Sequence, residues 1–245
     1  MKTNGNTILI TGGATGIGFS LADAFVEFGN RVLICGRREA KLREAKSKLP
    51  QLETMVCDVI NSGDRQALFR WATTQFPDLN ILVNNAGIQR QIDFTKGPQA
   101  LSDGENEIAA NFEAPIHLTA LFIPHLLRQR DAAIMNVTSG LGFTLLAILP
   151  VYCATKAAMH SFSLSLRHQL RATSIRVFEL IPPTVDTELD RGAREQRNQK
   201  DRGIHPDEVA RAALQGLSGD QDEIVIGAAE RLKADPAKMC PMINH

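Results

Sequence analysis

The sequence is poor in several features, and each shortage excludes a class of protein. No apolar run approaches the roughly 18 residues of a membrane span, and the opening MKTNGNTILITGG lacks the apolar core and cleavage site of a signal peptide. Net charge is also absent, because 27 basic residues balance 27 acidic ones. We therefore expect a cytoplasmic protein without a nucleic-acid or membrane partner.

Cysteine, histidine and aromatic residues offer few candidates for chemistry. The four cysteines form no C-x-x-C pair, and three lie in apolar segments, which favours buried, reduced thiols. His117 and His125 lack a partner at metal-ligand spacing, and His160 and His168 are interpreted as packing or surface residues of a helix, so no metal site is predicted. The single tyrosine, Tyr152, either packs on a helix or does the chemistry.

What the sequence does contain is a regular alternation of two kinds of apolar segment. Short β-rich runs at 6–11, 31–36, 53–59, 80–87, 132–139, 174–181 and 223–227 alternate with helical spacing at 17–29, 38–49, 64–76, 104–130, 152–172 and 206–217. This order predicts a parallel sheet with helices on both faces, in one α/β domain over residues 1–245. The charged segment 186–203 is either a solvated loop or a substrate flap spanning about 186–205.

A glycine-rich turn, TGGATGIG (11–18), joins the first expected strand to the first expected helix. Glycine at positions 12, 16 and 18 permits a tight turn and close approach of a diphosphate to the backbone. The N–H groups and positive end of the following helix then face that anion. The turn predicts dinucleotide binding; a plain glycine-rich turn is the alternative.

The end of the second expected strand indicates which dinucleotide is bound. An acidic residue there would bind the ribose 2′-hydroxyl of NAD, whereas arginine suits the 2′-phosphate of NADP. The sequence has CGRRE, with Arg37 placed 19 residues after Gly18 and no acid at the strand end. NADP(H) is therefore favoured, although Arg37 and Arg38 could simply begin a solvated helix.

Tyr152, Lys156 and Ser139 together can support proton transfer. Tyr152 and Lys156 are four residues apart and so share one face of a helix. A nearby ammonium lowers the pKa of a phenol, which lets tyrosine act as general acid or base. Ser139 ends the strand 132–139 and can polarise a carbonyl, with Thr138 as the competing hydroxyl.

These motifs together resemble the compact branch of the short-chain dehydrogenase/reductases. The matches run from residue 11 to 187: TGGATGIG, Asp58, NNAG (84–87), Asn111, Ser139, YCATK (152–156) and PPTVDT (182–187). CGRR, PVYCATKAAMHSFSLSLRHQL and PPTVDT further resemble the oxidoreductases named after genes for D-alanylation of teichoic acid. The resemblance implies a Rossmann-type doubly wound sheet in the order 3-2-1-4-5-6-7, hydride transfer between NADP(H) and a carbonyl or secondary alcohol, and a homodimer or homotetramer.

The resemblance also implies roles for individual residues. Asn111 would hold a water in a proton relay with Lys156, and Lys156 would also bind the ribose next to the nicotinamide. One departure is Pro183, where the family usually has glycine, which stiffens the entry to the 186–205 loop. The implied cofactor contacts are Gly12, Thr15, Gly16, Ile17, Gly18, Arg37, Arg38, Asp58, Val59, Asn85, Ala86, Gly87, Tyr152, Lys156, Pro182, Val185 and Thr187.

The substrate is indicated only by the apolar stretch GLGFTLLAILPV between Ser139 and Tyr152. It predicts a mainly apolar carbonyl compound or secondary alcohol, faced by some of Leu141, Phe143 and Leu145. Gln89 and Arg90, after NNAG, are expected to add a polar contact to this small-molecule substrate. Two alternatives stay open: epimerisation or dehydration on the same scaffold, and a non-enzymatic NADP(H)-binding regulator.

Overall fold

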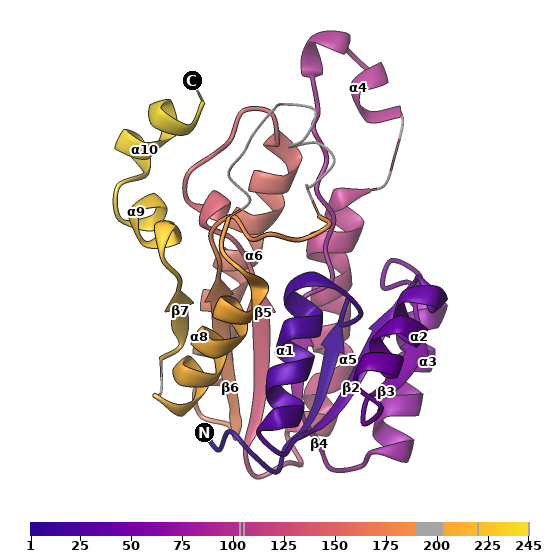
Figure 1. Cartoon of the computed structure of the whole chain (residues 1–245). Coiled ribbons are helices and arrows are strands. Elements are labelled where there is room, and N and C mark those ends of the chain that lie inside the picture. The colour runs from indigo at the N-terminus through magenta and orange to yellow at the C-terminus, as the bar shows by residue number, and fades with distance from the viewer. Residues whose placement is uncertain (103, 105, 190–202, 220, 245) are drawn as a thin grey trace.

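The computed structural model describes residues 1–102, 104, 106–189, 203–219 and 221–244. Seven parallel strands form one sheet in the order β3-β2-β1-β4-β5-β6-β7, which confirms the predicted topology (Figure 1). The strands are β1 (Thr7–Thr11), β2 (Arg31–Gly36), β3 (Glu53–Val56), β4 (Leu79–Asn84), β5 (Ala132–Val137), β6 (Ile175–Ile181) and β7 (Glu223–Val225).

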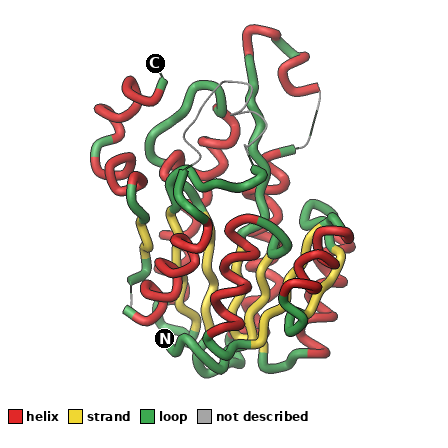
Figure 2. The backbone as a smooth tube through the Cα atoms, in the orientation of Figure 1, coloured by secondary structure: helices red, strands yellow, loops and turns green. Residues whose placement is uncertain are grey.

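Helices cover both faces of the sheet, as the tube in Figure 2 shows. The longer ones are α1 (Gly16–Glu27), α2 (Glu39–Lys48), α3 (Ser62–Gln75), α5 (Ala114–Leu126), α6 (Pro150–Leu170) and α8 (Pro206–Ser218). Short helices are α4 (Gln99–Ser102), α9 (Ala228–Ala234) and α10 (Pro236–Ile243), with turns of 3-10 helix at η1 (Phe94–Lys96) and η3 (Gly140–Gly142). A π-helical turn, η2 (Ala109–Glu113), leads into α5. No helix within the described ranges is long and apolar enough to cross a membrane.

The apolar core has two layers because side chains alternate along each buried strand. Ile8 and Ile10 of β1 pack with α1, α2 and α8, whereas Leu9 between them packs with α3, α5 and α6. Both layers are closely filled: Phe25 of α1 is buried in the first and Phe122 of α5 in the second. Because helices cover both faces of the sheet, successive residues of a strand are buried. This explains why the strands are continuous apolar runs.

The structure differs from the sequence expectations mainly at the ends of elements. The strands expected at 53–59 and 80–87 end at Val56 and Asn84, and the helical region expected at 104–130 runs from Glu107 through η2 to the end of α5 at Leu126. Residues 190–202, most of the expected flap, lie outside the described residues. Its described ends are joined, because Val185 and Ile204 form a parallel bridge.

All seven strands point the same way, so their carboxyl ends share one edge of the sheet, at the top in Figure 1. Beyond this edge the chain adds α4 on one side and α9 and α10 on the other (Figure 1). Open α/β sheets bind ligands at this edge. The fold therefore brings the segments after β1, β2, β4, β5 and β6 together at one place.

Candidate active site

A pocket of about 790 Å³ lies at the carboxyl edge of the sheet. Its walls come from the glycine turn, the ends of β2, β4, β5 and β6, and the first turns of α6. Asn111 is the predicted site residue that does not line it. The structure brings the others together there: Gly12, Thr15, Gly16, Ile17, Gly18, Arg37, Arg38, Asp58, Val59, Asn85, Ala86, Gly87, Ser139, Tyr152, Lys156, Pro182, Val185 and Thr187.

The glycine turn forms a cradle in which larger side chains have no room. Gly12 and Gly16 adopt φ of +65° and +55°, a conformation that favours glycine. A Cβ on Gly18 would lie 2.4 Å from the carbonyl oxygen of Gly12 and 2.5 Å from Nδ2 of Asn85. Asn85 in turn donates from Nδ2 to the Thr11 carbonyl at 2.9 Å, which fixes the turn against β4.

The turn opens directly onto the first turn of α1, where a helix presents unpaired N–H groups. Thr15 precedes the helix, and its side chain makes no capping bond to it. These N–H groups and the positive end of the helix dipole suit the diphosphate of a dinucleotide. The cradle thus fits the cofactor that the glycine spacing predicts.

Cationic side chains gather at the far end of the pocket, after β2. Arg37 and Arg38 both line the pocket, and Nη2 of Arg38 donates to Oγ1 of Thr15 at 3.3 Å. Asp58 and Val59 follow β3 on the same side, and the Asp58 carboxylate accepts from the main-chain N–H of Ile60 at 3.0 Å. The end of the pocket after β2 therefore carries guanidinium groups that can pair with an anion.

Lys156 and Tyr152 lie buried on one face of α6, at the other end of the pocket. Nζ of Lys156 donates to the Val137 carbonyl at 2.9 Å and lies 5.6 Å from the centre of the Tyr152 ring. Burial lowers the pKa of Lys156 to about 8, and the carboxylate of Glu179 acts against that shift. The phenol and the ammonium are thus close enough for the charge to affect the phenol.

Ser139 and Thr138 differ in what their hydroxyls do. Oγ1 of Thr138 donates to the Glu179 carboxylate at 2.7 Å, which uses its proton. Oγ of Ser139 instead accepts from the main-chain N–H of Leu141 at 3.1 Å, a bond that leaves its proton for another partner. Ser139 is therefore the better placed of the two to donate a hydrogen bond into the pocket.

Asn111 lies in the π-helical turn η2 and is buried beside the pocket rather than in its wall. Its side chain accepts from the Ile88 N–H and donates to the Ile88 carbonyl, both at 2.8 Å. Nδ2 also donates to Oγ1 of Thr155 at 3.2 Å. The side chain thus fixes the loop after Gly87 to α6, close to Lys156.

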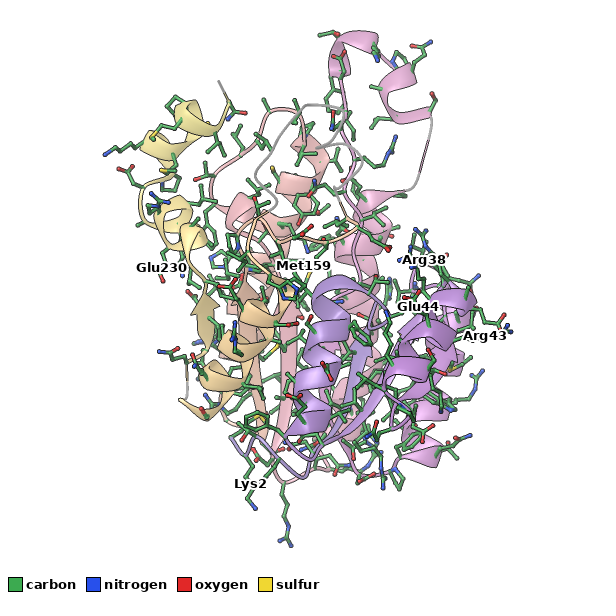
Figure 3. The ribbon with its side chains drawn as sticks, viewed as in Figure 1. Lys2, Arg38, Arg43, Glu44, Met159 and Glu230 are labelled. Carbon is green, nitrogen blue, oxygen red and sulfur yellow. The ribbon has the colours of Figure 1, made fainter. Side chains whose placement is uncertain are left out.

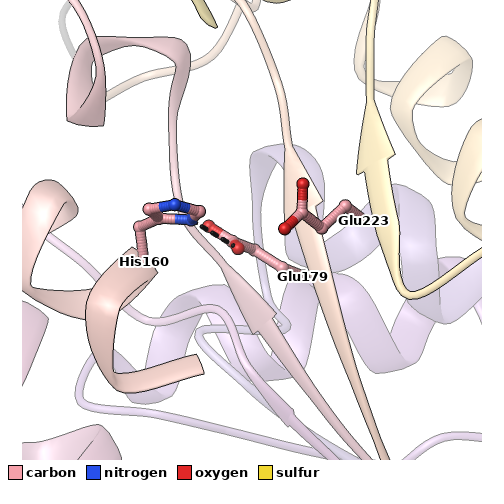
Figure 4. Close-up of side chains that lie close together, drawn as sticks. All are labelled: His160, Glu179 and Glu223. Carbon is pink, nitrogen blue, oxygen red and sulfur yellow. Dashed lines mark hydrogen bonds and ion pairs between the residues drawn. The ribbon is translucent and has the colours of Figure 1, made fainter. Parts of the chain in front are cut away.

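A buried carboxylate that the sequence did not single out lies behind Ser139 and Lys156. Glu179 of β6 is fully buried, and its second oxygen is 2.8 Å from Nδ1 of His160, one turn after Lys156 on α6 (Figure 4). His160 also packs edge to face on Phe143, with ring centres 4.6 Å apart. Glu179 therefore links the end of β5 to α6, and no motif in the sequence marks it.

His160, Glu179 and Glu223 place one potential ligand atom each within 4.8 Å of one another. Lys233 forms an ion pair with Glu223, and Nη1 of Arg167 lies 3.6 Å from the same carboxylate. These cations neutralise Glu223, whereas Glu179 lies against His160 and accepts from the Thr138 hydroxyl, so both carboxylates already have partners within the protein. Of the remaining histidines, His125 is buried and its Nε2 lies 2.9 Å from the Leu79 carbonyl, whereas His117 and His168 are exposed.

The wall of the pocket beside Ser139 is apolar. Leu141, Leu146 and Leu149 line it from the loop before α6, whereas Phe143 packs on His160 instead and Leu145 is exposed. Gln89 lines the pocket, but Arg90 does not; its main-chain N–H donates to Glu107 at 3.0 Å. Two further lining residues, missed in the sequence, come from the C-terminal helices: Leu232 of α9 and Ile243 of α10.

Comparison with known proteins finds similar sequences and structures among the dehydrogenases and reductases. The family model of the short chain dehydrogenases matches residues 6–198. An oxidoreductase of Bacillus subtilis named DltE is 51% identical over 248 residues, covering 100% of this chain and 98% of its own. A solved serine dehydrogenase complexed with NADP⁺ is 28% identical with a TM-score of 0.79, covering 86% of this chain and 89% of its own. A 3-ketoacyl-(acyl-carrier-protein) reductase of Brucella melitensis complexed with NADH is 26% identical with a TM-score of 0.80, covering 91% and 95%.

Proposed function

The chain belongs to the short chain dehydrogenases, a family of NAD(P)-dependent oxidoreductases, and from this premise we propose that it is an NADP(H)-dependent carbonyl reductase or alcohol dehydrogenase. The observation that carries the proposal is the placement of Tyr152 and Lys156, buried together on α6, at the end of a pocket that begins with the glycine turn. Fold and family alone do not select a reaction. A buried phenol beside a buried ammonium does, because that pair is suited to proton transfer.

The cofactor is held by residues along the whole pocket. The cradle of Gly12, Gly16 and Gly18 receives the diphosphate, and Arg37 and Arg38 receive the 2′-phosphate. Asp58 and Val59 flank the adenine, and Asn85, Ala86 and Gly87 line the groove between the two ends. Pro182, Val185 and Thr187 follow β6, line the pocket and would contact the nicotinamide end.

Reduction of a carbonyl then divides between the cofactor and three side chains. When bound, the nicotinamide supplies a hydride to the carbonyl carbon or accepts one in the reverse reaction. Tyr152 donates its phenolic proton to the carbonyl oxygen, and Ser139 donates a hydrogen bond that stabilises charge on that oxygen. Lys156 holds its ammonium 5.6 Å from the centre of the Tyr152 ring, where the positive charge stabilises negative charge that develops on the phenol oxygen. The same ammonium would bind the ribose hydroxyls. The family resemblance implies that Asn111 would hold a water that connects Lys156 to solvent.

The substrate we propose is a mainly apolar ketone, aldehyde or secondary alcohol. Leu141, Leu146 and Leu149 form one wall beside Ser139, and Leu232 and Ile243 close the pocket from the C-terminal helices. Burial of apolar surface against these side chains supplies most of the binding energy for such a compound. Gln89 adds a polar contact at the rim.

Loss of NADPH absorbance on addition of a panel of ketones, aldehydes and hydroxy acids tests the proposal. We expect stoichiometric oxidation of NADPH with apolar carbonyl compounds and much slower oxidation of NADH. Cofactor binding without turnover of any compound would favour a non-enzymatic regulator. Conversion of substrate without net NADPH consumption would favour epimerisation or dehydration.

We further propose that the protein is a homodimer or homotetramer with α5 and α6 at the interface. Leu127 at the end of α5 and Leu164 of α6 are large apolar side chains that remain exposed in the single chain. Burial of such residues favours association. Light scattering after size exclusion should give two or four times the mass of the chain, and a monomer at micromolar concentration would contradict this.

A further inference from the structure

An acidic side chain of the protein occupies the place where the cofactor phosphate is expected. Glu188 lies beyond β6, yet its carboxylate reaches the positive residues that follow β2. Oε2 is 3.1 Å from Nη1 of Arg38, and Oε1 is 3.4 Å from Nζ of Lys41. Nη2 of the same arginine donates to Thr15 in the glycine turn, so three distant segments meet here.

All four of these residues line the pocket, at its cationic end. Arg38 precedes α2, and Figure 3 shows it at the upper end of that helix, where the helix meets the edge of the sheet. Each oxygen of Glu188 faces a different cation, which is also how two oxygens of a phosphate are commonly held. Glu44, followed by Glu188, holds the pKa of Lys41 above its usual value, and Arg38 and Lys41 hold the pKa of Glu188 below its own. The carboxylate is therefore ionised at neutral pH.

We propose that Glu188 is a specificity-determining residue that occupies the 2′-phosphate subsite and competes with the 2′-phosphate of NADP(H) for Arg38 and Lys41. This inference rests on the proposed preference for NADP(H). A phosphate monoester carries about −1.5 to −2 charges at neutral pH and displaces a carboxylate that carries one. The 2′-hydroxyl of NAD(H) has no charge and leaves the ion pairs in place. Glu188 therefore weakens binding of NADP(H) selectively.

The size of the effect follows from the exposure of the three side chains. Arg38 is 53% exposed, Glu188 46% and Lys41 33%, so solvent screens both ion pairs. Exposed pairs of this kind change an equilibrium by about 1.4- to 5-fold each. Removing the carboxylate alone should therefore tighten NADPH binding by about two- to five-fold.

Glu188→Gln, which keeps the shape but removes the charge, tests the inference without any substrate. Dissociation constants are measured by fluorescence titration for NADPH, NADH, 2′,5′-ADP and 5′-AMP. We expect tighter binding of NADPH and 2′,5′-ADP, with NADH and 5′-AMP unchanged. Unchanged or weaker NADPH binding in the variant would overturn the inference, as would equal tightening of all four ligands.

Glu44→Gln is the matched control, because Glu44 pairs with the same Lys41 at 3.1 Å but does not line the pocket. If it tightens NADPH binding as much as Glu188→Gln does, the effect is general electrostatics and the inference fails. The dissociation constants of the unmutated protein for NADPH and NADH test the proposed cofactor preference separately from the role of Glu188. Equal native affinity for NADPH and NADH refutes the cofactor preference, whereas the role of Glu188 is decided only by whether its variant favours the ligands with a 2′-phosphate.

Discussion

Nζ of Lys156 donates a hydrogen bond to the carbonyl of Val137, 2.9 Å away at the carboxyl end of β5. This bond joins the helix that carries Tyr152 to the strand that leads into Ser139. It also keeps the ammonium inside the protein, because Lys156 is only 6% exposed. Burying a charge is costly. The protonation of Lys156 should therefore affect both the pH dependence of stability and the pH profile of the reaction.

Stability should depend on pH through Lys156. Its pKa is about 8 in the folded protein against 10.5 for an ordinary lysine, so between these values the unfolded chain binds a proton that the folded protein has released. The free energy of unfolding therefore rises with pH across that window. Below pH 8 burial of the charge costs roughly 3 kcal/mol, offset in part by about 1 kcal/mol from the bond to Val137.

Lys156→Met should thus stabilise the protein by about 2 kcal/mol at pH 7, with a gain that shrinks as the pH approaches 10. Urea denaturation at several pH values measures this. Lys238→Met, at an exposed position on α10, is the control and should show no such trend. A stabilisation that stays constant or grows with pH would contradict the burial of a charged lysine.

Tyr152→Phe should lower turnover by about 100-fold or more, the usual scale of general acid catalysis, because phenylalanine has no proton to donate. Binding of NADPH should persist, since the ring and its packing are kept. Single-turnover kinetics and fluorescence titration measure the two effects separately. Unchanged turnover would exclude Tyr152 as the acid, and loss of NADPH binding would mean that the variant had disturbed the pocket.

Glu179→Gln should change the pH profile of the reaction. The Glu179 carboxylate raises the pKa of Lys156, so its neutral analogue should make the lysine lose its proton at lower pH. We expect the alkaline limb of kcat/KM for carbonyl reduction to move to lower pH. Glu223→Gln removes a neighbouring carboxylate that bonds to Lys233 instead, and it should leave that limb in place. A role of Glu179 in packing alone would lower activity equally at every pH.

Much of the fold could be predicted because its signals are local. The alternation of strands and helices follows from apolar spacing, and the parallel sheet follows from the right-handed crossover, whereas the order of the strands was implied by the family resemblance. The short helices α4, α9 and α10 were not predicted, since each is too brief to show a helical period. The strands expected to reach 59 and 87 end at Val56 and Asn84, because the chain leaves the sheet there to form the pocket wall.

Some residues in and behind the pocket are marked by local sequence spacing, and others are not. Gly18, Tyr152 and Lys156 could be found because their spacing along the chain is set by one turn or one helix. Glu188, and Glu179 behind the pocket, could not, because their partners Arg38, Thr138 and His160 are distant in the sequence and only tertiary structure brings them together. The burial that lowers the pKa of Lys156 is likewise invisible in the sequence.

Arg37→Asp should reverse the choice of cofactor. The arginine lines the cationic end of the pocket, and a carboxylate there would repel a 2′-phosphate but accept a bond from a 2′-hydroxyl. We expect NADPH binding to weaken by about 10- to 100-fold and NADH binding to strengthen. Arg43→Asp, on the outer face of α2, serves as the control for added negative charge. If NADPH remained as strongly favoured in Arg37→Asp, Arg37 would not contact the phosphate.

Gly18→Ala should disrupt the cradle of the turn. The new Cβ would lie 2.4 Å from the Gly12 carbonyl oxygen and 2.5 Å from Nδ2 of Asn85, which is closer than real Cβ contacts. Relief of this clash must move the turn away from β4, so we expect a loss of about 1–3 kcal/mol in the free energy of unfolding and weaker binding of every dinucleotide. Gly36→Ala is the control for stability, because a Cβ there meets no atom within 4 Å. Equal melting temperatures for the two variants would show that the turn is not packed as tightly as these distances require.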